Sequence, residues 1–226
     1  MDFKVASVDS IIIYFGREIS QEISLKVKKA YKSIMALKDE SLIEIIPSYN
    51  SIFITYDIFT YDFVSLKQKI ERSITFNSLR QDDEKIVSID VYYGVEVGFD
   101  LEDISKKTSL SIEEIISLHS SKIYDVYAIG FLPGFAYLGN VDKKIAMPRL
   151  SSPRKKVPKG SLALADTQTA IYPQDSAGGW NIIGKTAMEL FDKSLDTLSP
   201  LSGGNRVRFN PITKEEFLKQ GGILWV

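Results

Sequence analysis

The chain has 226 residues, of which 44% are hydrophobic and 25% are charged, and its formal net charge is −1. This composition is typical of a soluble globular protein, and so small a net charge excludes a general attraction to nucleic acid or to an anionic membrane. Cysteine is absent, which excludes disulfides and thiolate metal sites. The longest apolar runs are too short to span a bilayer and the first residues lack the pattern of a signal peptide, so we expect a cytoplasmic protein. We also expect no metal site, since the chain has no cysteine and a single histidine.

The first ninety residues predict a small α+β domain. Short β-branched and aromatic runs predict four strands, at 10–15, 42–47, 51–56 and 86–92. Apolar residues spaced three and four apart predict two helices, at 19–37 and 63–74. The resulting order, β-α-β-β-α-β, is that of the ferredoxin-like fold. We therefore expect a ferredoxin-like domain at 1–90, and nothing in it indicates catalysis.

Residues 100–120 predict two short helices joined by a tight turn. Ser111 and Glu114 form a capping box for the second helix. The pair resembles a helix-turn-helix, but its second helix has no arginine and no third helix supports it, so we exclude a DNA reader. His119 is the only histidine of the chain, and a histidine without neighbouring catalytic or metal-binding partners is usually a hydrogen-bonded structural residue. It is still a candidate for acid–base catalysis, because histidine alone titrates near neutrality.

Residues 130–184 hold seven of the fourteen glycines and five of the eight prolines. Glycine permits unusual backbone geometry and proline fixes φ, so together with aromatic and basic side chains they predict rigid, closely specified loops. Binding and catalysis commonly lie on such loops. We therefore place the candidate functional site in this segment.

A basic loop within this segment predicts an anion site. Five positive charges lie between Arg149 and Lys159 with no acid among them, and prolines recur at intervals of five. Arginine can hold a carboxylate or phosphate with two parallel hydrogen bonds. Arg149 and Arg154 are the candidate catalytic cations. Binding residues for the substrate or anion are expected to be Lys156, Gln168, Tyr172, Gly178, Gly179 and Trp180. The alternative is a solvated basic loop, or one that docks an acidic partner.

The string from Gly179 to Thr186 matches the phosphate-loop pattern G-x-x-x-x-G-K-[ST]. A phosphate loop follows a buried strand and opens a helix, whereas this string follows a turn and contains bulky residues typical of a strand. We therefore interpret Lys185 as a coincidental match. Further short strands are predicted at 92–97, 124–130, 161–165, 169–172, 180–183 and 206–209. These strands favour a β-barrel over 91–226.

The same segments resemble one protein family. The matching stretches are YAIGFLPGFAYLG (127–139), PRLSSPRKKVPKGS (148–161), QTAIYP (168–173), GGWNIIGKT (178–186) and NRVRFNPI (205–212). They are similar to the family of the 5-oxoprolinase B subunit, also known as allophanate hydrolase subunit 1 and as the sporulation kinase inhibitor family. The resemblance implies a ferredoxin-like domain followed by a cyclophilin-like β-barrel, and in this family an arginine usually stands where this chain has Lys185.

The resemblance also implies partners and an activity. The 5-oxoprolinase C subunit (allophanate hydrolase subunit 2) and the A subunit would act with this chain to convert 5-oxo-L-proline to L-glutamate at the expense of ATP. Opening a lactam through a phosphorylated oxygen needs fixed cations, which Arg149, Arg154 and Lys156 can supply. No complete catalytic set is visible, so the chain is expected to be inactive alone. The alternative is a regulator that inhibits a sensor histidine kinase, with residues 131–137 as the contact.

Overall fold

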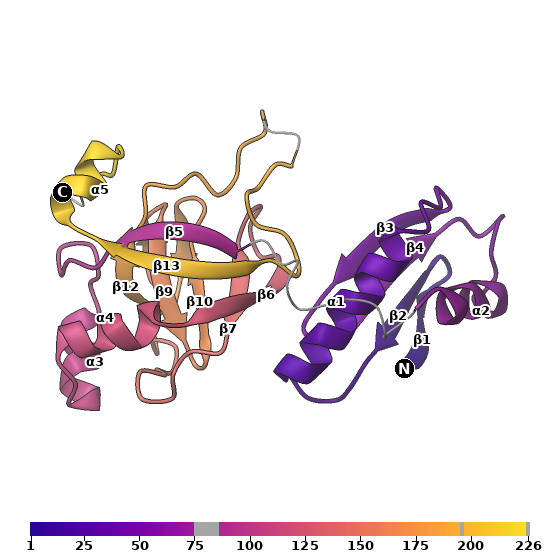
Figure 1. Cartoon of the computed structure of the whole chain (residues 1–226), viewed down its shortest axis with the longest axis horizontal. Coiled ribbons are helices and arrows are strands. Elements are labelled where there is room, and N and C mark those ends of the chain that lie inside the picture. The colour runs from indigo at the N-terminus through magenta and orange to yellow at the C-terminus, as the bar shows by residue number, and fades with distance from the viewer. Residues whose placement is uncertain (75–85, 195–196, 225–226) are drawn as a thin grey trace. The chain divides into compact units, whose positions relative to one another are not determined.

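The computed structural model describes residues 1–74, 86–194 and 197–224. The chain divides into two compact units, Met1–Asp83 and Glu84–Val226, which are described separately (Figure 1). No helix among the described residues is long and apolar enough to cross a membrane.

The first unit is an antiparallel sheet packed against two helices. Its elements are β1 (Asp2–Ser7), β2 (Ser10–Tyr14), α1 (Gln21–Met35), β3 (Leu42–Pro47), β4 (Ser51–Tyr56) and α2 (Phe63–Ser73). The strand order is β1-β2-β4-β3. α1 connects β2 to β3, and β4 lies between these two strands, which is the split βαβ arrangement of a ferredoxin-like fold.

One strand of this sheet differs from the four that the sequence predicted for this unit. The strand expected at 86–92 forms, as β5 (Ile86–Tyr92), but it belongs to the barrel of the second unit. β1, which the sequence did not predict, pairs with β2 and takes the edge position. Most of its residues are exposed, so it lacks the apolar signal of a buried strand. The expected domain boundary at 90 therefore lies inside the barrel's own residues.

Side-chain caps mark the first residues of both helices of the first unit. Ser20 accepts a hydrogen bond from the Ile23 amide at the start of α1, and Asp62 with Ser65 forms a capping box for α2. One face of α1 buries Val27, Ala30 and Ile34. These side chains join isoleucines from β2 and β4 in the core of the unit.

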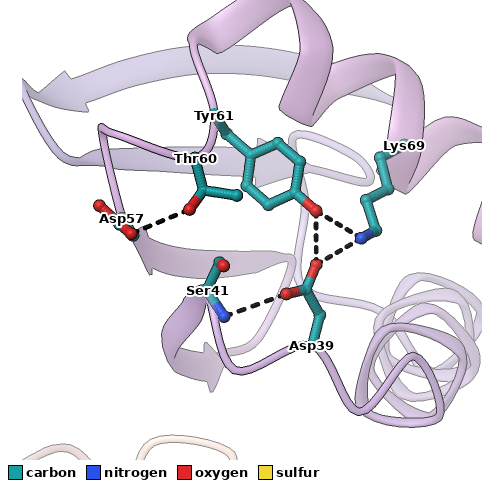
Figure 2. A network of polar contacts seen from close by, with 6 residues as sticks. All are labelled: Asp39, Ser41, Asp57, Thr60, Tyr61 and Lys69. Carbon is teal, nitrogen blue, oxygen red and sulfur yellow. Dashed lines mark hydrogen bonds and ion pairs between the residues drawn. The ribbon is translucent and has the colours of Figure 1, made fainter.

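A polar network ties the loop after α1 to α2 (Figure 2). Asp39 accepts hydrogen bonds from Tyr61 Oη at 2.7 Å and from the Ser41 amide at 3.0 Å, and it forms an ion pair with Lys69 on α2. The hydrogen bonds from Lys69 and Tyr61 lower the pKa of Asp39 from 3.8 to about 2. The ionised carboxylate therefore stabilises the fold of this unit.

Asp39→Asn should reduce the stability of the first unit at neutral pH. The pKa of Asp39 is lower in the folded chain, so its contribution is present above 3.8 and is lost as pH falls toward about 2. Hydrogen-exchange protection of α2 and β3 should be weaker in the variant at neutral pH and should approach that of the unaltered chain near pH 2. Asp57→Asn, which removes a carboxylate bonded to Thr60, is the control. An equal difference at both pH values would contradict the assigned role.

The second unit is a closed β-barrel. Its strand order is β10-β7-β6-β13-β5-β12-β9, and β13 runs parallel to β5 while the other pairs are antiparallel. Besides β5, the strands are β6 (Ile123–Ile129), β7 (Ala136–Gly139), β9 (Ser161–Ala165), β10 (Gln168–Ile171), β12 (Asn181–Lys185) and β13 (Arg206–Ile212). The barrel confirms the expected fold class, because these strands bury a continuous apolar interior.

The helices of the second unit lie outside the barrel. α3 (Leu101–Thr108) and α4 (Ile112–Ser120) form the predicted pair, and the capping box of Ser111 and Glu114 is present. α4 packs against β13 on one side of the barrel (Figure 1). A short α5 (Lys214–Lys219) follows β13 and was not predicted.

In the second unit one predicted strand is wrong, and three observed strands were missed. Residues 92–97 do not continue β5, because the amides of Val97 and Gly98 bond back to the Gly94 carbonyl and close a turn. β7, β8 (Arg154–Val157) and β11 (Ser176–Gly178) have at most four residues each. Strands so short, and in part charged or rich in glycine, give little periodicity to detect.

Candidate functional site

A two-stranded ribbon beside the barrel brings the basic loop to the glycine-rich turn. β8 pairs antiparallel with β11, so that Arg154 lies opposite Gly178. The Leu150 amide donates a hydrogen bond to the Gly179 carbonyl at 2.7 Å. Nδ2 of Asn181 donates to the Pro148 carbonyl at 2.9 Å. These hydrogen bonds hold together two segments that are some thirty residues apart in sequence, so both have a fixed position at the site.

A cavity of about 250 Å³ opens between these segments, and we call it the aromatic pocket. Its lining residues are Phe131, Phe135, Tyr137, Arg149, Pro153, Tyr172, Ala177, Gly178, Gly179 and Trp180. The rings of Tyr172 and Trp180 each meet Phe135 edge-on, at centroid distances of 5.3 and 5.8 Å. Edge-to-face packing of this kind makes the wall rigid.

Arg149 supplies the positive charge of the aromatic pocket. Its guanidinium carbon lies 5.8 Å from the centre of the Trp180 ring, which is a cation–π distance. No carboxylate among the described residues lies within ion-pairing distance of Arg149. The planar fork of N–H donors therefore stays available to an anionic ligand.

Gly178 lets the turn approach Tyr172 closely. A Cβ at this position would lie 2.2 Å from the Tyr172 hydroxyl oxygen, so any larger residue would displace the ring. Tyr172 is almost completely buried, and burial raises the pKa of its hydroxyl. The hydroxyl therefore stays protonated at neutral pH, when it can act as a hydrogen-bond donor but not as a base.

Arg154 has a different role from Arg149. Its Nη2 forms an ion pair of 2.6 Å with Asp100, whose side chain is 7% exposed, and its Nη1 donates to the Trp180 carbonyl at 3.4 Å. Asp100 also accepts a hydrogen bond from the Ile182 amide at 2.6 Å. The sequence predicted that Arg154 would serve the ligand; the structure instead places its guanidinium against Asp100 and the Trp180 carbonyl, and Arg154 does not line the aromatic pocket.

Arg154→Ala should destabilise the second unit, because it leaves the buried Asp100 carboxylate with an amide donor but no cation. The expected loss of unfolding free energy is about 1.5–3 kcal/mol, the range for hydrogen bonds to charged groups. Urea unfolding can be followed by tryptophan fluorescence, since Trp180 is buried in this unit. Lys155→Ala, an exposed neighbour on β8, is the control. Unchanged stability of the Arg154 variant would contradict its structural role.

Two other predicted binding residues do not line the aromatic pocket. Lys156 forms an ion pair of 2.7 Å with Asp175 at an exposed position. Gln168 lies in β10, where its backbone pairs with Gly139 and Ala165. The predicted residues that do meet in the pocket are Arg149, Tyr172, Gly178, Gly179 and Trp180.

His119 lies in the core of the barrel and is fully buried. The Thr169 hydroxyl donates to the Ala163 carbonyl, so it accepts a hydrogen bond from Nε2 of His119 at 3.0 Å, while Tyr93 Oη donates to Nδ1 at 2.9 Å. Burial lowers the pKa of His119 to about 3. The ring is therefore neutral and inaccessible, and this placement gives no support to the acid–base role considered from the sequence.

The phosphate-loop string forms barrel strand β12 rather than a loop. Its residues pair with β9, and Ile182 and Ile183 are fully buried. Backbone amides engaged in a sheet cannot wrap a phosphate. Lys185 is accordingly not a phosphate-loop lysine, in agreement with the interpretation of the sequence.

Sequence reasoning missed two features of the site. The aromatic residues Phe131, Phe135 and Tyr137 were considered only as a contact for a kinase, yet they line the pocket. Asp100 was not singled out, because only the fold brings it to β8 and β12, more than fifty residues away. Over the part of the chain that the structure describes, no group of three or more acidic, histidine or cysteine residues could hold a metal ion.

Comparison with known proteins gives consistent matches. The sequence model of the family "Carboxyltransferase domain, subdomain C and D" matches residues 1–201. The protein of Bacillus subtilis that is named as the B subunit of 5-oxoprolinase is 36% identical over 92% of this chain and 91% of its own length. The protein of the same name from Haemophilus influenzae is 37% identical over 76% of this chain and 80% of its own.

A solved structure extends the likeness to the fold. The crystal structure of TTHA0988 matches 90% of this chain with a TM-score of 0.80 and 30% sequence identity. This chain corresponds to only 40% of the TTHA0988 chain. The matched region there is part of a polypeptide more than twice as long.

Proposed function

Because this chain belongs to the family of the 5-oxoprolinase B subunit and matches carboxyltransferase subdomains C and D, we propose that it acts in an ATP-dependent 5-oxoprolinase as one of its subunits. The complex would hydrolyse 5-oxo-L-proline to L-glutamate. The observation that carries the proposal is identity of 36% over nearly the whole length of both chains, in a protein named for this activity. The motifs that resemble this family build the aromatic pocket of this chain.

The aromatic pocket suits the proposed substrate. 5-Oxo-L-proline is a small ring with one carboxylate and a lactam group. Its carboxylate would take the N–H fork of Arg149, and its ring would pack on Trp180 and Phe135. Tyr172 would donate a hydrogen bond to a ring or carboxylate oxygen. These residues bind and orient the substrate, and the pocket contains no general base among the described side chains.

The chain is proposed to act only within a complex. Opening a lactam is uphill, so phosphate from ATP would activate the lactam oxygen. The phosphate-loop string of this chain is a barrel strand and gives no reason to place ATP here. We therefore assign ATP and the missing catalytic groups to the partners, the A subunit and the carboxylase-like C subunit. The longer chain of TTHA0988 supports this view, since its matched part is covalently joined to further polypeptide.

Reconstitution tests this function. ATP-dependent release of glutamate from 5-oxo-L-proline should be absent with this chain alone and should appear when the A and C subunits are added. Omitting this chain from the mixture should abolish turnover. Full activity of the A and C subunits without it would overturn the proposal.

Arg149→Ala should impair the reconstituted enzyme without unfolding the barrel. Loss of a charge-assisted hydrogen bond to the substrate should lower kcat/KM by roughly 10- to 100-fold. Lys155→Ala, on the same basic loop but exposed on β8, is the matched control and should change kcat/KM less than about twofold. Unchanged activity of the Arg149 variant would place the substrate elsewhere while leaving this chain's membership of the complex intact.

Inhibition of a sensor histidine kinase is not favoured. The three curated relatives that match this chain are all named as the B subunit of 5-oxoprolinase. The proposed kinase contact at 131–137 also has a different explanation, because Phe131, Phe135 and Tyr137 line the aromatic pocket.

A further inference from the structure

A second cavity lies at the other end of β12, and its volume is about 630 Å³. We call it the Lys185 cavity. Its lining includes Lys156, Lys159, Asp175, Lys185, Glu189 and the backbone around Gly222. It shares no lining residue with the aromatic pocket. None of the residues proposed to bind the lactam substrate lines it.

Lys185 is a buried cation that has one hydrogen-bond acceptor and no paired carboxylate among the described residues. The residue is 8% exposed at the end of β12, where it pairs with Ser161 of β9 and Tyr92 of β5. Its ammonium donates one hydrogen bond, to the Ile223 carbonyl at 2.8 Å. An ammonium has three N–H donors, and no carboxylate in the described parts of the chain lies within ion-pairing distance of this one.

The other charges of the cavity are already paired. Lys156 pairs with Asp175 at 2.7 Å and Lys159 pairs with Glu189 at 2.5 Å, and all four side chains are about half exposed. Each pair is neutral in sum, so the charge left in the cavity is that of Lys185. Burial lowers the pKa of Lys185, and the more distant Asp175 opposes this effect.

Backbone geometry holds the Lys185 side chain in its place. Gly160 has a φ of +81°, and a Cβ there would meet the Thr186 carbonyl oxygen at 2.3 Å. This close approach locks the turn before β9 against the end of β12, with the Thr186 amide bonded to the Gly160 carbonyl at 2.9 Å. The cation is therefore set on a rigid barrel strand rather than on a mobile loop.

We propose that the Lys185 cavity binds a small oxyanion, a carboxylate or a phosphate, with the Lys185 ammonium as its counter-ion. Burying a cation without a counter-ion is costly, and a bound oxyanion would accept the N–H donors that the Ile223 carbonyl leaves over. The cavity has room for such a ligand beside the side chains that line it. The inference does not depend on the proposed activity, because it rests on the chain's own buried charge.

Calorimetric titration of the full chain tests the proposal. The probes are inorganic phosphate, acetate and 5-oxo-L-proline, each compared with chloride at the same ionic strength. At least one probe should bind saturably, and Lys185→Met should weaken that binding by at least about tenfold, the factor that about 1.4 kcal/mol gives. Lys155→Met, an exposed lysine outside the cavity, should bind as the unaltered chain does.

Stability measurements separate a binding defect from a folding defect. Lys185→Met removes an uncompensated charge and keeps an unbranched side chain of similar size, so its melting temperature should not fall. Lys185→Gln is the second variant, which should also fold and should also lose the anion. Phosphate should raise the melting temperature of the unaltered chain if phosphate is the ligand, and acetate or 5-oxo-L-proline should do so if a carboxylate is.

The proposal is overturned if no probe binds the unaltered chain at millimolar concentration, or if both Lys185 variants bind as tightly as that chain. It is also overturned if binding is lost only in Arg149→Ala, because the anion then occupies the aromatic pocket. Since the partner proteins are left out of these titrations, their result is separate from that of the reconstituted assay.

Discussion

The carboxylate of Asp100 joins parts of the second unit that are far apart in sequence. One oxygen accepts the Ile182 amide of β12 and the other pairs with Arg154 of β8. The Asp100 amide in turn donates to the Ile182 carbonyl. A buried carboxylate held by a cation and an amide has few alternative arrangements, so the ribbon of β8 and β11 has a defined position on the barrel. Trp180, and with it the aromatic pocket, depends on that position.

The two arginines of the basic loop have different contacts although they lie close together in sequence. Arg154 is engaged with Asp100 and with the Trp180 carbonyl, whereas Arg149 lies over the Trp180 ring, and its proposed role is to bind the substrate carboxylate. The two cavities lie at opposite ends of β12. Trp180, just before the first residue of the strand, lines the aromatic pocket, and Lys185, its last residue, lines the Lys185 cavity.

Much of the fold and part of the site could be predicted from the chain itself. Capping residues such as Ser111 and Glu114 act over a single helical turn, and the strands from β2 to β6 have clear apolar runs, so local patterns were sufficient for them. Local patterns, however, do not reveal which sheet a strand joins. β5 looks like a partner for the first unit, yet its register with β13 and β12 places it in the barrel.

The amino-acid sequence by itself determined the order of helices and strands, the rigid glycine- and proline-rich loops, and the family to which their motifs point. These features depend on backbone preferences and on side chains a few positions apart. Only the tertiary structure decided which charges are free. Arg149, Arg154 and Lys156 look alike in one basic loop, but Asp100 and Asp175 reach two of them from distant segments. The fold likewise buries His119 and Lys185, since burial is a property of the packed barrel and not of the residue type.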